Sequence, residues 1–95
     1  MVLLHIEHRV ADFAGWKAAF DGDPVGRERS GVRRYWIRRA IDDPNLVVID
    51  LEFDTTREAE GLLAAMREVW QVVEPAGLVE GPQARIVETV ETKEY

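Results

Sequence analysis

The stretch that decides the fold is Val2–Val10, which reads Val-Leu-Leu-His-Ile-Glu-His-Arg-Val. Side chains on a β-strand alternate between its two faces. One face then carries a nearly continuous apolar row: Val2, Leu4, Ile6, His8 and Val10. The other face carries ionisable groups beside a leucine: Leu3, His5, Glu7 and Arg9. The stretch therefore predicts a strand with one side packed on a hydrophobic layer, and with His5 and Glu7 adjacent on the other.

Apolar spacing predicts two helices. Asp12 is placed to cap the first, and the turn-forming residues Asp21–Pro24 end it. Thr55 followed by Glu58 is a capping-box signature that opens the second, which stops at Pro75. Each helix carries one apolar stripe. The stripes consist of Phe13, Trp16, Ala19 and Phe20 in the first helix, and of Ala59, Leu62, Leu63, Met66, Val69, Trp70 and Val73 in the second.

Three further strands are predicted, over residues 31–41, 46–53 and 84–92. The residue chemistry of Asp42–Asn45 predicts a tight turn between the first two of them, and Gly81-Pro82 predicts another turn before the last. In the last strand, Ile86 and Val90 are expected on one face, with Arg85 and Val87 on the other.

The register of the hairpin between residues 31 and 53 is open by one residue, and a slip would exchange the two faces. We expect the register that keeps Arg34 and Arg38 out of the core. One face then holds Tyr35, Ile37, Ile41, Val47, Ile49, Leu51 and Phe53. The other holds Trp36, Arg38, Ala40, Val48, Asp50 and Glu52. Arg39 falls on the apolar side, where it needs a sheet edge from which to reach solvent.

The order strand, helix, strand, strand, helix, strand predicts a single α+β domain over residues 1–95, of the ferredoxin-like βαββαβ type, with a four-stranded antiparallel sheet. The first and third strands are central in such a sheet, which places His5 and Glu7 beside Asp50. Two helices cover only one face of the sheet. The other face would expose Leu3, Trp36 and Val48 among charges, as an interface or a ligand groove does.

Composition excludes several functional classes. The formal net charge of −6 argues against nucleic acid or an anionic membrane as the partner. The chain has no cysteine, hence no thiolate nucleophile or sulfur-ligated metal. No apolar run approaches the roughly 20 residues that span a bilayer, and no secretory leader pattern is present, which predicts a cytoplasmic protein. His5 and His8 are three apart on a strand and point to opposite faces, so no metal site is expected.

Several segments together resemble the small dimeric α/β-barrel proteins related to antibiotic-biosynthesis monooxygenases and polyketide cyclases. These segments are the histidine-bearing first strand, Asp12-Phe13, Trp16-Lys17, Phe20-Asp21, Gly31, Arg39, Asp42–Asn45, Ala59 and Ala76-Gly77-Leu78. The resemblance covers almost the whole chain and implies a homodimer whose open sheet faces enclose a cavity for a small molecule. Its members include cofactor-free oxygenases, polyketide cyclases, lactone isomerases and haem enzymes, so the fold leaves the chemistry open.

The resemblance suggests a cofactor-independent enzyme acting on a planar, polyketide-like or phenolic substrate. His5 would remove a proton, oriented by Glu7 or Asp50. Arg38 would stabilise the developing enolate, and Trp36 would stack on the ring. Val48 and Glu52 complete the predicted substrate-binding set, which consists of Trp36, Arg38, Val48 and Glu52.

Other interpretations remain open for the same residues. The His5 and Glu7 pair can be a hydrogen-bonded cluster at a dimer interface, and the charges around it can be interface ion pairs. The protein would then be a non-catalytic homodimeric ligand-binding or accessory protein, or an interaction module that uses its sheet edges. A roomy cavity with His5 exposed in it would favour catalysis over these alternatives.

Overall fold

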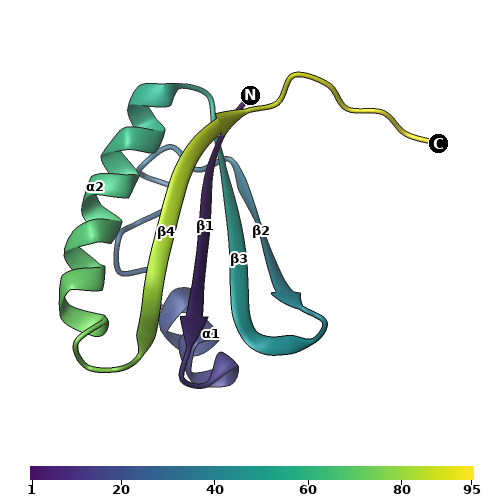
Figure 1. The fold of residues 1–95 in the computed structure, drawn as a ribbon. Helices are drawn as coiled ribbons and strands as arrows, with labels where there is room; N and C mark the ends of the chain where they lie inside the picture. The colour runs from purple at the N-terminus through teal and green to yellow at the C-terminus, as the bar shows by residue number, and fades with distance from the viewer.

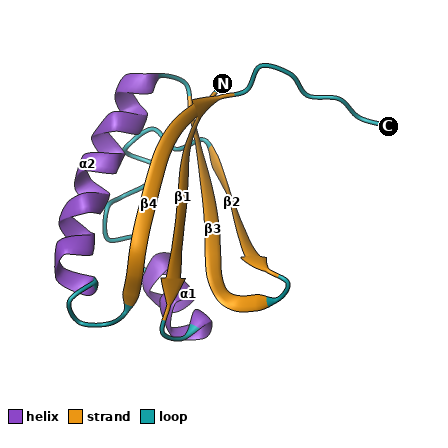
Figure 2. Ribbon diagram, viewed as in Figure 1, coloured by secondary structure: helices purple, strands orange, loops and turns teal.

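The computed structural model describes residues 1–95 as four strands and two helices, in the predicted order. The elements are β1 (Val2–Val10), α1 (Phe13–Asp21), β2 (Arg34–Ala40), β3 (Asp43–Phe53), α2 (Thr56–Val73) and β4 (Val79–Glu88). The strands form one antiparallel sheet in the order β2-β3-β1-β4, and both helices lie on the same face of it (Figures 1 and 2). This is the predicted ferredoxin-like fold, with β1 and β3 in the centre. Neither helix is long and apolar enough to cross a membrane.

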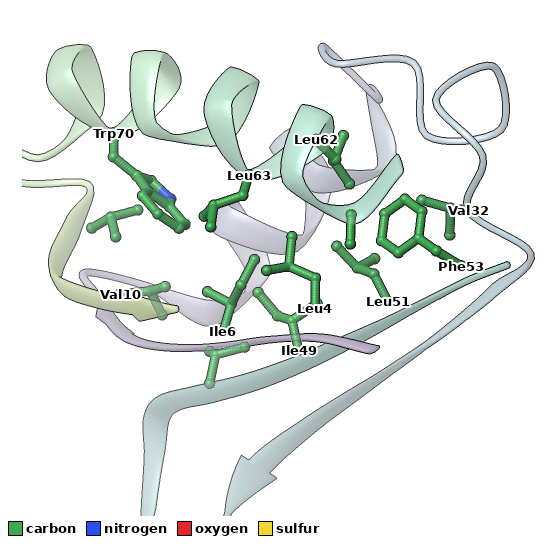
Figure 3. Packing of buried hydrophobic residues seen from close by; sticks show 13 residues of the cluster. Leu4, Ile6, Val10, Val32, Ile49, Leu51, Phe53, Leu62, Leu63 and Trp70 are labelled. Atoms are coloured by element: carbon green, nitrogen blue, oxygen red, sulfur yellow. The ribbon is translucent and has the colours of Figure 1, made fainter. Parts of the chain in front are cut away.

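The hydrophobic core lies between the central strands and α2 (Figure 3). The apolar row of β1 and the alternate residues of β3 are buried, as their period of two predicts. From α2, the predicted stripe supplies the facing layer. The buried side chains at this interface include Leu4, Ile6, Val10, Val47, Ile49, Leu51, Phe53, Ala59, Leu62, Leu63 and Trp70.

Both predicted helix caps are confirmed. The Asp12 carboxylate accepts a hydrogen bond of 2.8 Å from the backbone N–H of Gly15 at the start of α1. The Thr55 hydroxyl accepts one of 3.2 Å from the N–H of Glu58 at the start of α2. Each satisfies an amide that has no partner within the helix.

The predicted hairpin register is also confirmed. Tyr35 pairs with Leu51 and Ile37 with Ile49, so these side chains share the covered face of the sheet. Strand β2 is an edge strand, so the long side chain of Arg39 can extend past the edge of the sheet and keep its charge in solvent. Its guanidinium lies 4.5 Å from the ring centroid of Phe13, a cation–π contact that the sequence did not predict.

The predicted turn at Asp42–Asn45 is wrong. The chain turns at Ile41-Asp42, β3 already begins at Asp43, and β2 begins at Arg34 rather than at residue 31. Ala40 pairs with Asp43, but the preceding residue, Arg39, pairs with Val47. The residues of β3 between these two pairs, including Pro44, therefore have no partner on β2. A proline, which has no N–H to donate, is therefore tolerated inside β3. Ile41 sits in the turn and is fully exposed, not on the apolar face.

The fourth strand also differs from its prediction. It spans Val79–Glu88, so Gly81-Pro82 lies inside the strand and not in a turn. Gly81 has a φ of +61°, and the register between β1 and β4 shifts beside it, as in a β-bulge. The bulge provides the irregular backbone that the glycine and proline suggested. Val90 lies beyond β4, in a C-terminal segment that runs away from the body of the protein and leaves this residue exposed (Figure 1).

Alanine at two glycine positions is expected to change stability in opposite directions. Gly31 has a φ of +103°, and a Cβ there would collide with the carboxylate of Glu58, so Gly31→Ala should cost about 1–3 kcal/mol. Gly61 is exposed in α2 and a Cβ there meets nothing within 4 Å, so Gly61→Ala should gain about 0.5–1 kcal/mol. Urea unfolding measures both. A gain at Gly31 would contradict the backbone geometry of this loop.

Candidate functional site

The open face of the sheet brings together four of the residues predicted for the site. His5 on β1 lies opposite Asp50 on β3, and its Nδ1 is 2.7 Å from Asp50 Oδ1. The other oxygen of Asp50 accepts a hydrogen bond of 3.3 Å from Arg38 on β2. Glu7 Oε1 lies 3.8 Å from His5 Nε2. We call His5, Glu7, Asp50 and Arg38 the open-face cluster.

The other predicted residues surround this cluster. Trp36, together with Arg38 and Asp50, lines a shallow hollow of about 340 Å³ on the open face. The carboxylate of Glu52 is paired with Arg34, and Val48 is half-buried opposite Glu7. In the single chain the His5 side chain is 36% exposed, so this face is open to solvent.

The two histidines lie on opposite faces of the sheet, as their spacing predicts. His5 belongs to the open face, whereas His8 is 3% exposed on the face covered by the helices. No group of three or more histidine, cysteine, aspartate or glutamate residues is arranged to hold a metal ion.

A second candidate site lies on the covered face, and the sequence did not predict it. A partly open cavity of about 200 Å³ lies between β1 and β3 on one side and α1 and α2 on the other, and we call it the interlayer cavity. Fifteen of its 20 lining residues are hydrophobic. No residue of α1 is buried, and the small residues Gly15 and Ala19 face the cavity. The short helix therefore leaves space that larger side chains would fill.

His8 is the unusual group in the interlayer cavity. Its ring lines the cavity, lies edge-on to Trp16 with centroids 5.6 Å apart, and has an Nδ1 without any hydrogen-bond partner. Burial lowers the pKa of His8, and the nearby backbone at Arg9 and at His8 itself opposes the effect only in part. The imidazole is thus neutral at pH 7. A neutral imidazole with a free nitrogen in an apolar cavity can exchange a proton with a bound molecule.

The sequence did contain a signal for this residue. His8 is the single polar side chain in the apolar row of β1, and its place in that row predicts a core position. A buried polar atom without a partner costs about 1–3 kcal/mol. A buried nitrogen that has no hydrogen-bond partner in the folded protein is therefore a candidate for binding a ligand.

Comparisons with family models and with curated proteins return no match. Solved structures, in contrast, match along nearly the whole chain. A protein from Deinococcus radiodurans aligns with a TM-score of 0.76 and 14% identity over 100% of this chain and 98% of its own. A protein from Bordetella bronchiseptica aligns with a TM-score of 0.68 and 16% identity, over 95% of this chain and 98% of its own. A protein from Nitrosomonas europaea aligns with a TM-score of 0.59 and 20% identity, over 96% of this chain and 100% of its own.

Each of the three is named a "putative antibiotic biosynthesis monooxygenase". At these identities the likeness establishes a shared fold and leaves the chemistry to the residues of this chain. The protein is thus a ferredoxin-like α+β domain that shares its fold with these three structures. Within that fold it carries an apolar cavity with a buried imidazole, and a charged cluster on the open face of its sheet.

Proposed function

We propose that the protein is a cofactor-independent small-molecule enzyme that binds a planar phenolic or polyketide-like substrate in the interlayer cavity and uses His8 as the proton-transferring group. The observation that carries the proposal is the Nδ1 of His8, which is buried and unpartnered in an otherwise apolar cavity. The names of the three structural neighbours support the same class of small-molecule chemistry.

The size and walls of the cavity favour a flat, apolar ligand. A protein cavity of about 150 Å³ accommodates benzene, and the interlayer cavity has about 200 Å³. Trp16, Phe20 and Trp70 contribute aromatic surface to its walls. Aromatic rings favour offset or edge-on packing against other rings. A molecule of one or two fused rings therefore suits this space better than a polar metabolite.

Proton transfer is the chemistry that His8 supports. Its neutral Nδ1 accepts a proton from an acidic hydroxyl or carbon of the substrate, which leaves an electron-rich anion and an imidazolium. The imidazolium is poorly solvated in this cavity, so it readily returns the proton to the product. Asp12 is the single carboxylate among the lining residues. The substrate anion is the species that would go on to cyclise or to react with dioxygen.

The test is binding of 2-naphthol, followed by tryptophan fluorescence and by native mass spectrometry. Trp36 lies on the open face, so a Trp36→Phe background leaves Trp16 and Trp70, which both line the cavity, as reporters. Binding should change their emission and add one ligand mass per chain. Ala19→Leu narrows the cavity and should abolish binding, whereas Ala14→Leu, at a residue of the same helix that does not line the cavity, should not. Equal binding by both variants would contradict the proposal.

A homodimer with a site on the open face is the second candidate. It is supported by the distance of 2.7 Å from His5 Nδ1 to Asp50 Oδ1 and by the hollow at Trp36. In a homodimer that packs two open faces together, His5 would take the proton, Asp50 would orient it, and Arg38 would stabilise the enolate. Full turnover by a His5→Ala variant would remove this candidate. A ligand that binds but is recovered unchanged would favour a non-catalytic carrier over either enzyme.

A further inference from the structure

Arg27 supplies the positive charge at the interlayer cavity, and an aromatic wall separates it from His8. The wall consists of Trp16 and Phe20, with ring centroids 5.2 Å apart. His8 lies 5.6 Å from the Trp16 ring, and the Arg27 guanidinium lies 3.8 Å above the Phe20 ring. All four residues line the cavity. The cavity therefore has a proton-exchanging group at one end of the wall and a cation at the other.

The charge of Arg27 is only partly satisfied by the protein. Its side chain is 14% exposed, and its Nη1 donates a hydrogen bond of 2.7 Å to the backbone carbonyl of Phe20. The same Nη1 is 3.4 Å from an Asp23 oxygen, which already accepts a hydrogen bond of 2.9 Å from the Arg27 backbone N–H. A guanidinium has five N–H donors. Those on Nε and Nη2 have no protein partner.

We propose that Arg27 makes the site selective for flat aromatic molecules that carry an anionic oxygen, a carboxylate or a phenolate. This inference rests on the proposed function and names its substrate class. The ring system lies along Trp16 and Phe20, the anionic oxygen binds the free donors of Arg27, and the other end meets His8. The planar fork of a guanidinium matches a carboxylate with two parallel hydrogen bonds, which are stronger than those between neutral groups.

The charges around the cavity agree with this selectivity. Arg27 is the one arginine or lysine among the lining residues, and Asp12, the one carboxylate, already accepts from the N–H of Gly15. The whole chain carries a formal net charge of −6, which repels anions in general. An anionic ligand that enters this apolar space therefore depends on the one guanidinium that faces it.

The experiment compares 2-naphthoate with its neutral isostere 2-naphthamide. The wild-type protein should bind 2-naphthoate about tenfold to a hundredfold more tightly. Arg27→Gln keeps a side-chain N–H for the Phe20 carbonyl but removes the charge, so it should bind both probes equally. Arg29→Met removes an exposed arginine of the same loop, outside the cavity, and should keep the preference. Urea unfolding checks that each variant is folded.

A titration of the wild-type complex gives an independent answer if Arg27→Gln does not fold. An apolar cavity by itself raises the pKa of a bound carboxylic acid, whereas contact with a guanidinium lowers it. The fluorescence of bound 2-naphthoate should therefore report a carboxyl pKa below its value in water. A raised pKa, or equal wild-type affinity for the two probes, would overturn the role of Arg27 and leave the proposed function intact. Failure of both probes to bind would instead reject the proposed function.

Discussion

Replacing His8 by phenylalanine is expected to abolish turnover and at the same time to stabilise the protein. A positioned general acid or base contributes about 10²–10⁴-fold to a rate, so kcat should fall by that factor if His8 transfers the proton. The phenyl ring fills the space of the imidazole and removes the unpartnered Nδ1. Because such an atom costs about 1–3 kcal/mol, the free energy of unfolding should rise by about 1 kcal/mol.

Two readouts distinguish this result from simple damage to the fold. Turnover is measured with the substrate identified by the binding experiments, and stability is measured by urea unfolding of the same preparation. The matched control is His5→Phe, which removes the other histidine from the open face and should leave kcat unchanged. A His8→Phe variant that is both inactive and less stable would indicate a structural imidazole and would count against its catalytic role.

The same variant should also lose part of the acid sensitivity of the wild-type protein. Burial lowers the pKa of His8 below its ordinary value of 6.5, so the unfolded chain binds a proton more readily than the folded one. This contribution to stability is present above pH 6.5 and is lost as the pH falls through the lowered pKa. All other ionisable groups are common to the two proteins, so the difference between the two unfolding curves isolates His8. As the pH falls, the free energy of unfolding of His8→Phe should rise relative to that of the wild type. A fall relative to the wild type would contradict the burial of a neutral imidazole.

Ile6→Ala is expected to lower the free energy of unfolding by about 2–5 kcal/mol. Ile6 is 0% exposed on the central strand β1 and borders the interlayer cavity. Truncation loses the transfer free energy of the removed methyl groups and also enlarges an existing void. The total stability of a small domain is about 5–15 kcal/mol, so one such change removes a large fraction of it.

The same substitution at an exposed isoleucine provides the control. Ile41 sits in the turn between β2 and β3 and is fully exposed, so Ile41→Ala should stay within about 0.5 kcal/mol of the wild type. Urea unfolding of the two variants, with the slope of the transition held in common, measures the contrast. Similar losses at both positions would mean that the turn packs against something in solution, and a small loss at Ile6 would contradict its burial.

The sequence alone determined the features that depend on neighbours along the chain. The alternation in Val2–Val10 predicted its two faces, and the apolar spacing predicted both helices with their caps at Asp12 and Thr55. The cost of burying the charges of Arg34 and Arg38 predicted the hairpin register, which the strand pairing confirms. The element order then predicted the fold and brought His5 next to Asp50. The faces, helices, caps and register follow from periods and preferences within short segments, and the fold follows from the order of those segments.

Only the tertiary structure decided where irregular backbone falls and where space is left unfilled. Asp42–Asn45 and Gly81-Pro82 have the composition of turns, but pairing with β1 and β2 made one the start of a strand and the other a bulge. The interlayer cavity exists because α1 and α2 do not fill the volume above the sheet, which depends on how two distant helices pack. Alternation places His8 in the apolar row, but it cannot predict that packing leaves its Nδ1 unpartnered or that Arg27 lines the same cavity. Those outcomes depend on distances between segments, and no local pattern encodes them.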